Sequence, residues 1–233
     1  MSSLKTAVVT GASSGIGRAI SLKLLELGYR VIGISRTLHV EQFNDVKFEV
    51  INADLSQEKD TLHVAKLLKE KSINILINAA GFGRFEPHEE LSTQTIMEMT
   101  FLNLTAPMLL TNATLRDLKK NSGYLININS IEAIKASKFA GVYSATKAGL
   151  KAFSDSLFEE TRRSELSITN INPDMTESSF YDELRFETSD KEDEKLLTSD
   201  IADAVEHILT MRKGAVVSDY TIRSLKFGIK KKR

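Results

Sequence analysis

The chain has 233 residues, of which 42% are hydrophobic and 27% charged, so it can bury a sizeable core beneath a polar surface. Lys plus Arg and Asp plus Glu each number 31, and this neutral sum argues against a general attraction to nucleic acid or to an anionic membrane. The lack of cysteine excludes disulfides, iron–sulfur clusters and thiol nucleophiles, and the four histidines have no metal-ligand spacing. No apolar run approaches about eighteen residues, and the first one is too short for an export signal. We therefore expect a cytoplasmic protein with no metal site and no nucleic-acid or membrane partner.

Apolar runs alternate with stretches of helical period along the whole chain. The expected strands are residues 6–10, 30–35, 46–51, 73–78, 124–129, 168–171 and 215–222. The expected helices are residues 15–27, 54–71, 92–120, 142–165 and 199–211. This alternation predicts an α/β fold with a single doubly wound parallel sheet of about seven strands and helices on both faces. About ten residues separate the second and third strands, so the helix between them is expected to be one turn or absent.

A glycine-rich turn, Thr10–Gly17, joins the first strand to the first helix. Gly11 permits a tight turn, Gly15 lets the backbone approach a phosphate, and Gly17 lets helix and strand pack closely. The helix N-terminus adds amide donors and the positive end of a dipole. The turn therefore predicts a dinucleotide site on a Rossmann fold, formed by Gly11, Ser13, Ser14, Gly15, Ile16 and Gly17.

The end of the second strand indicates which dinucleotide binds. A carboxylate there would hydrogen-bond ribose hydroxyls and repel a 2′-phosphate, but this chain has Ser35 and Arg36. A guanidinium can hold a phosphate through two parallel hydrogen bonds. We therefore expect NADP(H) to be preferred over NAD(H), with Arg18 reinforcing Arg36. The alternative is that Arg36 is an ordinary surface residue.

Further motifs follow in a recognisable order: Asn78-Ala-Ala-Gly81, Ser130, and Tyr143-Ser-Ala-Thr-Lys147. Together with the glycine turn, they resemble the short-chain dehydrogenase/reductase family over residues 5–178. Ser130 stands thirteen residues before Tyr143, which makes a chance agreement of all these motifs improbable. The resemblance implies one NAD(P)-binding domain over residues 1–233.

The chemistry of carbonyl reduction explains these residue types, because it needs a hydride on carbon and a positioned acid for oxygen. Tyr143 and Lys147 lie four apart on one helical face, and a nearby ammonium is expected to lower the pKa of the phenol. The resemblance implies that Tyr143 is the general acid/base and that Lys147 holds ribose hydroxyls. It implies that Ser130 hydrogen-bonds the substrate oxygen. It also matches Asn103 to an asparagine that anchors a water linked to the lysine.

The resemblance also extends to residues around the cofactor. Asp54 and Leu55 look like a pair that contacts adenine, although Asp54 is equally explained as a helix cap. After the sixth strand the family pattern of Pro-Gly and a hydroxyl residue becomes Pro173, Asp174 and Ser178, so the aspartate puts the loop geometry in doubt. The further cofactor-binding residues that the resemblance implies are Asn78, Ala79, Ala80, Gly81, Pro173 and Thr176.

Three stretches are expected to form the substrate walls: residues 81–87, 131–139 and 175–197. We call residues 175–197 the cover segment, and the spacing of Phe180, Tyr181, Leu184 and Phe186 predicts a mobile cover helix. Glu132 and Lys135 either contact a polar substrate or face solvent. Residues 182–194 carry seven acids against two bases, and residues 223–233 carry six bases and no acid. A solvated face and a frayed tail are the expected structures of these two stretches.

The sequence thus predicts an NADP(H)-dependent oxidoreductase that reversibly reduces a small ketone, aldehyde or 3-oxo acid to an alcohol. One alternative is an enzyme similar to 3-oxoacyl-acyl-carrier-protein reductase, although the last strand lacks the glycine-rich ending of such enzymes. Another is a non-catalytic, dinucleotide-sensing regulatory protein, which would be expected to have lost Tyr143 or Lys147. Family precedent implies a homodimer or homotetramer formed through helices 92–120 and 142–165.

Overall fold

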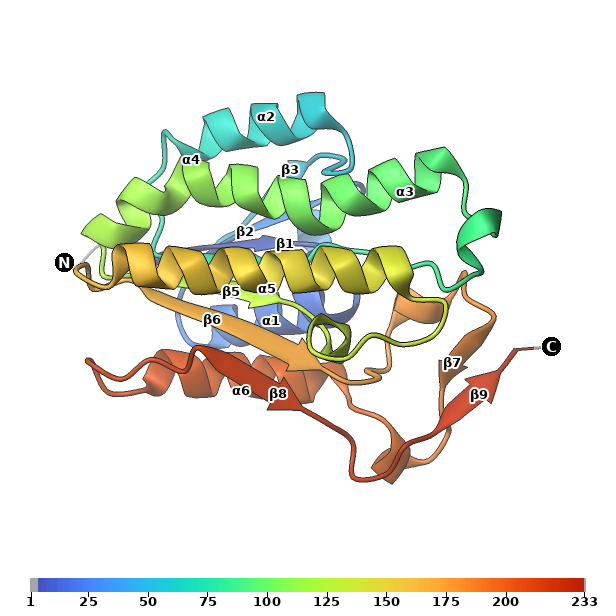
Figure 1. The fold of residues 1–233 in the computed structure, drawn as a ribbon. Coiled ribbons are helices and arrows are strands. Elements are labelled where there is room, and N and C mark those ends of the chain that lie inside the picture. Colours follow the sequence, from blue (N-terminus) through green and yellow to red (C-terminus); the bar gives the residue numbers. More distant parts are fainter. Residues whose placement is uncertain (1–3, 233) are drawn as a thin grey trace.

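The computed structural model of the protein describes residues 4–232. Its centre is a seven-stranded sheet in the order β3-β2-β1-β4-β5-β6-β8, and every neighbouring pair is parallel (Figure 1). Its strands are β1 (Thr6–Thr10), β2 (Arg30–Ser35), β3 (Phe48–Asn52), β4 (Ile75–Asn78), β5 (Tyr124–Ile128), β6 (Ser167–Pro173) and β8 (Asp219–Ile222). The order reverses between β1 and β4, so a crevice is expected at the carboxyl ends of these two strands.

Helices cover both faces of the sheet (Figure 1). They are α1 (Gly15–Glu26), α2 (Glu58–Leu68), α3 (Thr93–Thr100), α4 (Ala106–Lys120), α5 (Gly141–Thr161) and α6 (Thr198–Thr210). Helices α1 and α6 pack on one face through an apolar cluster that includes Ile20 and Ile201, while α2 and α4 pack on the other through Val64 and Leu110. The predicted fold class is confirmed. The short link between β2 and β3 is also confirmed, as a single 3₁₀ turn (Val40–Gln42).

Several strand boundaries differ from the prediction, and β4 begins two residues later than expected while β6 ends two residues later. Strand β3 begins at Phe48, because residues before it form a turn in which the Lys47 amide donates to the Asp45 carboxylate at 2.8 Å. Strand β8 begins at Asp219, whereas residue 215 was expected to start it. The chain turns after α6 at Gly214, whose φ of +91° favours glycine, and it reaches the edge of the sheet later than its apolar pattern suggested.

The expected helix over residues 92–120 is continuous but not uniform. Between α3 and α4, a π-helical segment, η3 (Phe101–Thr105), interrupts the α-helical hydrogen bonding. Asn103 lies in this segment and is fully buried. Such π-helical turns are frequent at functional sites, because the extra residue redirects a side chain.

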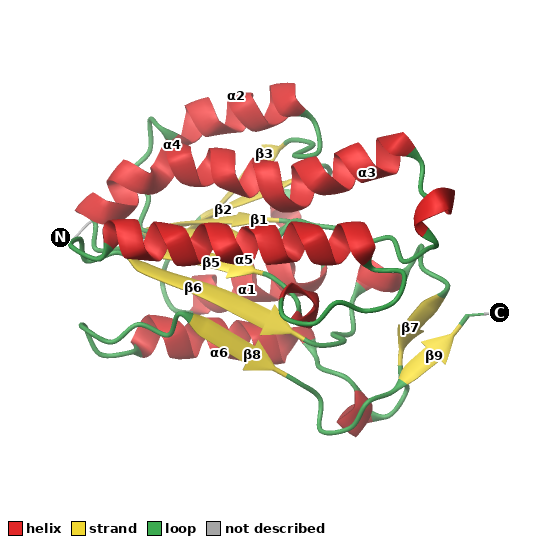
Figure 2. Ribbon diagram, in the orientation of Figure 1, coloured by secondary structure: helices red, strands yellow, loops and turns green. Residues whose placement is uncertain are grey.

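The expected helix in the cover segment is wrong. These residues form a 3₁₀ turn (Ser179–Tyr181), a short strand β7 (Phe186–Thr188) and a second 3₁₀ turn (Glu192–Glu194). Strand β7 pairs antiparallel with β9 (Ile229–Lys231) in a separate two-stranded sheet, which Figure 2 shows beside the C-terminus. Leu184, Phe186 and Thr188 are spaced by two, which is strand periodicity. Their pairing partner lies more than forty residues away, so the local pattern did not reveal it.

The C-terminal residues were expected to fray, and this is also wrong up to Lys232; Arg233 lies outside the described residues. The tail carries β9 and meets the acidic stretch directly. Lys226 pairs with Asp193 at 2.6 Å, and Lys230 pairs with Asp190 at 3.0 Å and Glu187 at 3.2 Å. Opposite charges that looked like two separate solvated stretches in the sequence therefore meet across the β7–β9 pair.

Candidate functional site

The glycine turn has the shape of a phosphate cradle. Gly11 has φ of +70°, its amide donates to the Ile34 carbonyl at 2.8 Å, and a Cβ at Gly17 would collide with the Gly11 carbonyl. Ser14 is the N-cap of α1 but makes no side-chain cap, and the first turn of the helix has no acid. In α3, by contrast, the Ser92 hydroxyl accepts a hydrogen bond from the Thr95 amide at 3.0 Å. The first backbone amides of α1 can therefore donate hydrogen bonds to an anion, as a phosphate of a dinucleotide would require.

Several of the residues predicted to bind the cofactor lie next to this turn. Thr10 Oγ1 accepts hydrogen bonds from the Ala79 and Ala80 amides, both at 3.0 Å, which ties the end of β4 to the end of β1. Ser13 and Ser35 hydroxyls lie 2.7 Å apart, which ties the turn to the end of β2. Across the turn, a Cβ at Gly15 would lie 3.2 Å from the Ser178 Cβ. The cradle is therefore bounded by the cover segment.

The residues predicted to bind the adenosine end of the cofactor, Arg36, Arg18 and Asp54, each have different neighbours. Arg36 is exposed beside Ser35 at the carboxyl end of β2, so this position carries a guanidinium and not a carboxylate. Arg18 also is exposed, and its guanidinium lies over the Phe43 ring at 5.9 Å from the centroid. The Asp54 carboxylate accepts hydrogen bonds from the Ser56 amide at 3.0 Å and hydroxyl at 2.7 Å. Asp54 thus shapes the turn before α2 but does not cap the helix, because α2 begins at Glu58 with Gln57 as its N-cap, later than the expected start at residue 54.

The structure brings Ser130, Tyr143 and Lys147 together. Tyr143 and Lys147 project from α5 and are 6% and 5% exposed, and the Lys147 ammonium lies 5.8 Å from the Tyr143 ring centroid. The Lys147 ammonium donates to the Ile128 carbonyl at 2.9 Å, at the end of β5. Ser130, two residues further along, lies close enough to the Tyr143 hydroxyl to lower its pKa. The helix spacing and the end of β5 therefore bring a buried phenol and a buried amine together with the half-buried hydroxyl of Ser130.

Asn103 completes this group from the π-helical segment. Its side-chain amide donates to the Phe82 carbonyl at 2.8 Å, and its oxygen accepts from the Phe82 amide at 3.1 Å. A Cβ at Gly81 would lie 3.0 Å from the Asn103 oxygen and 3.6 Å from the Lys147 ammonium. Asn103 thus fixes the loop after β4 beside Lys147, and glycine at position 81 keeps that space open.

The pKa values of the pair depend mainly on burial. Burial raises the pKa of Tyr143 to about 12, the Ser130 side chain lowers it, and the Glu132 charge raises it. Burial lowers the pKa of Lys147 to about 8. The net direction for Tyr143 in the chain alone is thus opposite to the expected one. Lys147 does not offset the desolvation of the phenol, and the group that lowers its pKa is Ser130.

Sequence reasoning left the role of Glu132 open between substrate contact and solvent. Its carboxylate instead accepts three hydrogen bonds, from the Ser137 amide at 2.9 Å, the Ser137 hydroxyl at 2.6 Å and the Ser144 hydroxyl at 2.8 Å. Glu132 therefore joins the 131–139 loop to the first turn of α5, one residue from Tyr143. Spacings of five and twelve residues belong to no regular helix or strand pattern, so no local signal pointed to these contacts.

The loop after β6 accommodates Asp174 where the family pattern has glycine. The Asp174 carboxylate accepts from the Met175 amide at 3.0 Å and from the Arg223 guanidinium at 3.1 Å. Pro173 and Thr176 are both buried, and the Glu177 amide donates to the Leu196 carbonyl at 2.8 Å. The aspartate thus anchors the loop to the end of β8, and the loop remains well packed.

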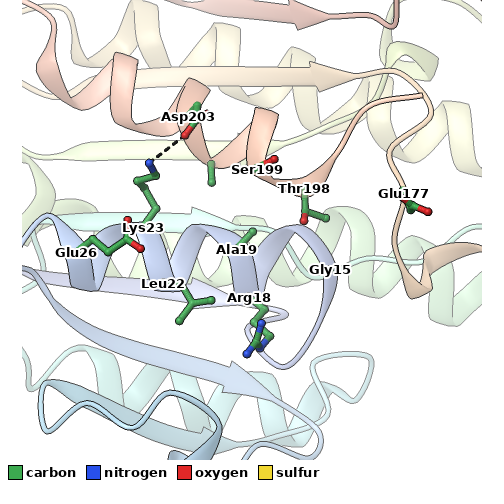
Figure 3. A pocket seen from close by; sticks show the side chains of 11 residues that line it. Gly15, Arg18, Ala19, Leu22, Lys23, Glu26, Glu177, Thr198, Ser199 and Asp203 are labelled. Carbon is green, nitrogen blue, oxygen red and sulfur yellow. Dashed lines mark ion pairs between the residues drawn. The ribbon is translucent and has the colours of Figure 1, made fainter. Parts of the chain in front are cut away.

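A groove of about 510 Å³ runs between α1 and α6 (Figure 3). Gly15 lies at one end of it, and Lys23 forms an ion pair with Asp203 at 3.0 Å across its other part.

Within residues 4–232, no group of three His, Asp or Glu side chains could hold a metal ion. No helix in this described range is long and apolar enough to cross a membrane.

The family model described as short chain dehydrogenase matches residues 5–188. The chain belongs to the short-chain dehydrogenase family. An uncharacterized oxidoreductase of Staphylococcus epidermidis is 31% identical over 226 residues, which cover 94% of this chain and 96% of that protein.

Solved structures share the fold at lower identity. An alcohol dehydrogenase from the archaeon Thermococcus sibiricus is 24% identical with a TM-score of 0.86, and the match covers 95% of this chain and 97% of that one. A 4-hydroxyisoleucine dehydrogenase is 23% identical with a TM-score of 0.84, covering 94% and 97%. At these identities the likeness establishes the α/β architecture of this short-chain dehydrogenase, and its chemistry must be argued from its own residues.

Proposed function

We propose that this short-chain dehydrogenase is an NADP(H)-dependent carbonyl reductase in which Tyr143 is the general acid/base. The observation that carries the proposal is the group of Tyr143, Lys147, Ser130 and Asn103 at the carboxyl ends of the strands. A dehydrogenase that had become a sensor would have no need to keep a charged lysine buried beside a tyrosine.

A bound dihydronicotinamide would supply the hydride, and the residues of the chain would supply the proton and the orientation. The raised pKa of Tyr143 keeps the phenol protonated at neutral pH, which suits donation to a carbonyl oxygen. Ser130 would hydrogen-bond that oxygen, and Lys147 would hold the ribose hydroxyls. Alcohol oxidation needs the tyrosinate, so the same enzyme would run the reverse reaction better at high pH.

Relatives of the fold support a nicotinamide dinucleotide as cofactor. The Thermococcus sibiricus alcohol dehydrogenase was solved with 5-hydroxy-NADP and the 4-hydroxyisoleucine dehydrogenase with NADH, so the fold admits both kinds of cofactor. For this chain, the preference for NADP(H) rests on Arg36. It is an exposed guanidinium next to Ser35, where an acid would repel a 2′-phosphate. The glycine turn and residues 78–81 would hold the rest of the dinucleotide.

The direct test is to mix the protein with NADPH and a panel of ketones, aldehydes and 3-oxo acids and to follow nicotinamide absorbance. The proposal expects oxidation of NADPH coupled one to one with alcohol formation. NADPH binding without turnover of any carbonyl in the panel would favour a regulatory dinucleotide-binding protein and contradict the proposal. Comparing acyl-thioester with free-acid substrates would separate it from an acyl-carrier reductase.

We also propose a homodimer or homotetramer formed through the continuous helix of α3 and α4 and through α5. Met97 on α3 is 62% exposed, which leaves an apolar side chain available to a second copy of the chain. Light scattering coupled to size-exclusion chromatography tests this directly. A monomer at micromolar concentration would contradict it.

A further inference from the structure

Four aromatic side chains gather around Tyr143, and we call Phe85, Phe180, Tyr181 and Phe186 the aromatic box. Ring centroids of Phe85 and Phe180 lie 5.2 Å and 5.9 Å from that of Tyr143. Phe186 lies 5.3 Å from Phe85 and 5.9 Å from Tyr181, and Tyr181 lies 5.1 Å from Phe180. Every distance falls in the range preferred by aromatic pairs. The box therefore forms one connected aromatic surface against the reacting phenol.

The backbone is shaped so that the rings can meet. A Cβ at Gly83 would come within 2.8 Å of the Phe85 ring and 2.9 Å of the Phe180 ring, so any side chain there would push them apart. Phe186 comes from β7, which β9 holds in place, and Phe180 and Tyr181 come from the 3₁₀ turn Ser179–Tyr181. The loop after β4 and two parts of the cover segment thus each contribute to the box.

The charges around the box disfavour an anionic substrate. Arg84 beside the box forms an ion pair with Glu183. The Lys232 ammonium donates to the Tyr181 and Asp182 carbonyls. The Glu132 carboxylate lies near enough to Tyr143 to raise its pKa. A substrate carboxylate would thus find Arg84 and Lys232 already paired with protein oxygens and would be repelled by Glu132. Burying such a carboxylate would therefore cost free energy.

Opening the box to admit a substrate breaks contacts between aromatic rings. A substrate that carries its own ring restores contacts of the same kind, whereas a small oxo acid does not. We propose that the substrate of this enzyme is a neutral carbonyl compound bearing an aromatic ring, an aryl ketone or aryl aldehyde, whose ring packs in the aromatic box. This inference rests on the proposed carbonyl reductase function.

The proposed reaction transfers one hydride and one proton to the carbonyl group of the substrate. The carbonyl carbon accepts a hydride from the bound dihydronicotinamide, which is thereby oxidised. The carbonyl oxygen accepts the proton of the Tyr143 hydroxyl, and the product is the aryl alcohol. The tyrosinate then regains a proton from solvent.

Three matched ketones test the specificity with NADPH as reductant: acetophenone, cyclohexyl methyl ketone and acetoacetate. Acetophenone and cyclohexyl methyl ketone have similar size, and only the first is aromatic. We expect kcat/KM for acetophenone to exceed that of cyclohexyl methyl ketone by about tenfold, which is the worth of about two aromatic contacts. Acetoacetate is expected to be the poorest of the three. Equal values for the two neutral ketones, or acetoacetate as the best substrate, would overturn the inference.

A matched pair of variants assigns the effect to the box. Phe180→Leu is expected to raise KM for acetophenone about tenfold and to leave KM for cyclohexyl methyl ketone within about threefold. Phe227→Leu is the control, because Phe227 is 67% exposed and lies outside the box. If Phe180→Leu fails to fold, Phe85→Leu takes its place. Equal losses with both ketones would overturn a role for the ring in specificity.

Calorimetric binding of 1-phenylethanol separates the failure of this inference from the failure of the proposed function. Turnover of carbonyls without a preference for aryl compounds leaves the function standing and overturns the inference. Binding of 1-phenylethanol that Phe180→Leu weakens, without turnover of any carbonyl, supports the box as an aromatic site and overturns the proposed function. Neither binding nor turnover overturns both.

Discussion

The two walls of the candidate site are held by different kinds of interaction. The polar wall is made of Ser130, Tyr143, Lys147 and Asn103, of which all but the half-buried Ser130 are buried. Lys147 donates to the Ile128 carbonyl at the end of β5, and Asn103 donates to the Phe82 carbonyl in the loop after β4. The cover segment, on the opposite side, is held by aromatic contacts and by ion pairs with the C-terminal tail. Exposed ion pairs contribute about 0.2–1 kcal/mol each, whereas a buried charge alters stability by several times more.

This difference suggests that one wall holds the reacting groups and the other controls substrate entry. Under the proposed function, the reacting groups belong to the polar wall, and the substrate would enter past the cover segment, which weaker interactions hold in place. Removing the buried charge of Lys147 should therefore lower the rate and raise the stability. Substitutions in the cover segment should change mainly substrate affinity and local opening.

Apart from changes at Tyr143 itself, the largest effect is expected for Lys147→Met. Losing the ammonium should lower kcat/KM for carbonyl reduction by about 10²–10³-fold, as expected for a group that orients a cofactor and supports proton transfer. The same variant should be more stable, because the charged form of Lys147 costs about 3 kcal/mol when its pKa falls from 10.5 to about 8. Kinetics and urea unfolding at pH 7 measure both.

The stability gain of Lys147→Met should depend on pH in a defined direction. Below pH 8 the lysine is charged in both folded and unfolded chains, so the full cost is present in the native protein. Between pH 8 and 10.5 the unfolded chain binds the extra proton, so wild-type stability rises and the advantage of methionine shrinks. Lys151→Met on the same helix is the control, since Lys151 pairs with Asp155 at 2.8 Å and its loss should not stabilise. A gain that does not change with pH would contradict a buried ammonium.

The next effect concerns Arg36, which lies outside both walls at the end of β2. Arg36→Ala should raise KM for NADPH by about 10- to 100-fold and leave KM for NADH nearly unchanged, because a charge-assisted hydrogen bond contributes about 1.5–3 kcal/mol. Arg116→Ala, at another exposed arginine on α4, is the control. Equal losses with NADPH and NADH would mean that Arg36 does not read the 2′-phosphate.

A smaller effect is expected in the cover segment. Lys230→Gln removes ion pairs with Asp190 and Glu187, so amide hydrogen exchange in residues 184–190 should become about three- to fivefold faster. The effect should vanish at 1 M salt, where wild type already opens as easily. Lys231→Gln is the matched control, since within residues 4–232 Lys231 forms no ion pair. Identical exchange rates in both variants would mean that the ion pairs of the C-terminal tail do not hold the cover segment in place.

The smallest effect is expected for Glu132→Gln. The Glu132 charge raises the pKa of Tyr143, so its removal should shift the rise of alcohol oxidation with pH to lower pH by less than about one unit. Carbonyl reduction at pH 7 should barely change, because the phenol stays protonated. Glu177→Gln, at an exposed glutamate of the cover segment, should leave the profile unmoved. A shift to higher pH would contradict the electrostatic effect.

The Tyr143–Lys147 pair and the glycine turn were predictable because their features are local, whereas Ser130 and Asn103 were assigned only through the family resemblance. Tyr143 and Lys147 share a helical face, and the glycine turn occupies one strand–helix junction, so the sequence alone places them. The cover segment was mispredicted because its structure depends on β9, far along the chain, and on charges that meet in space. The Glu132 contacts likewise follow no regular period. The direction of the Tyr143 pKa needed the burial of the phenol, which a sequence pattern does not give.

The measurement that tests the catalytic role of Tyr143 most directly is single-turnover reduction by Tyr143→Phe, with NADPH binding followed by cofactor fluorescence. The variant keeps the aromatic ring and loses only the hydroxyl, so the dissociation constant for NADPH should stay within about twofold of wild type. Hydride transfer to the best ketone of the panel should fall by about 10³-fold or more. Transfer within tenfold of the wild-type rate, with NADPH bound normally, would contradict Tyr143 as the proton donor.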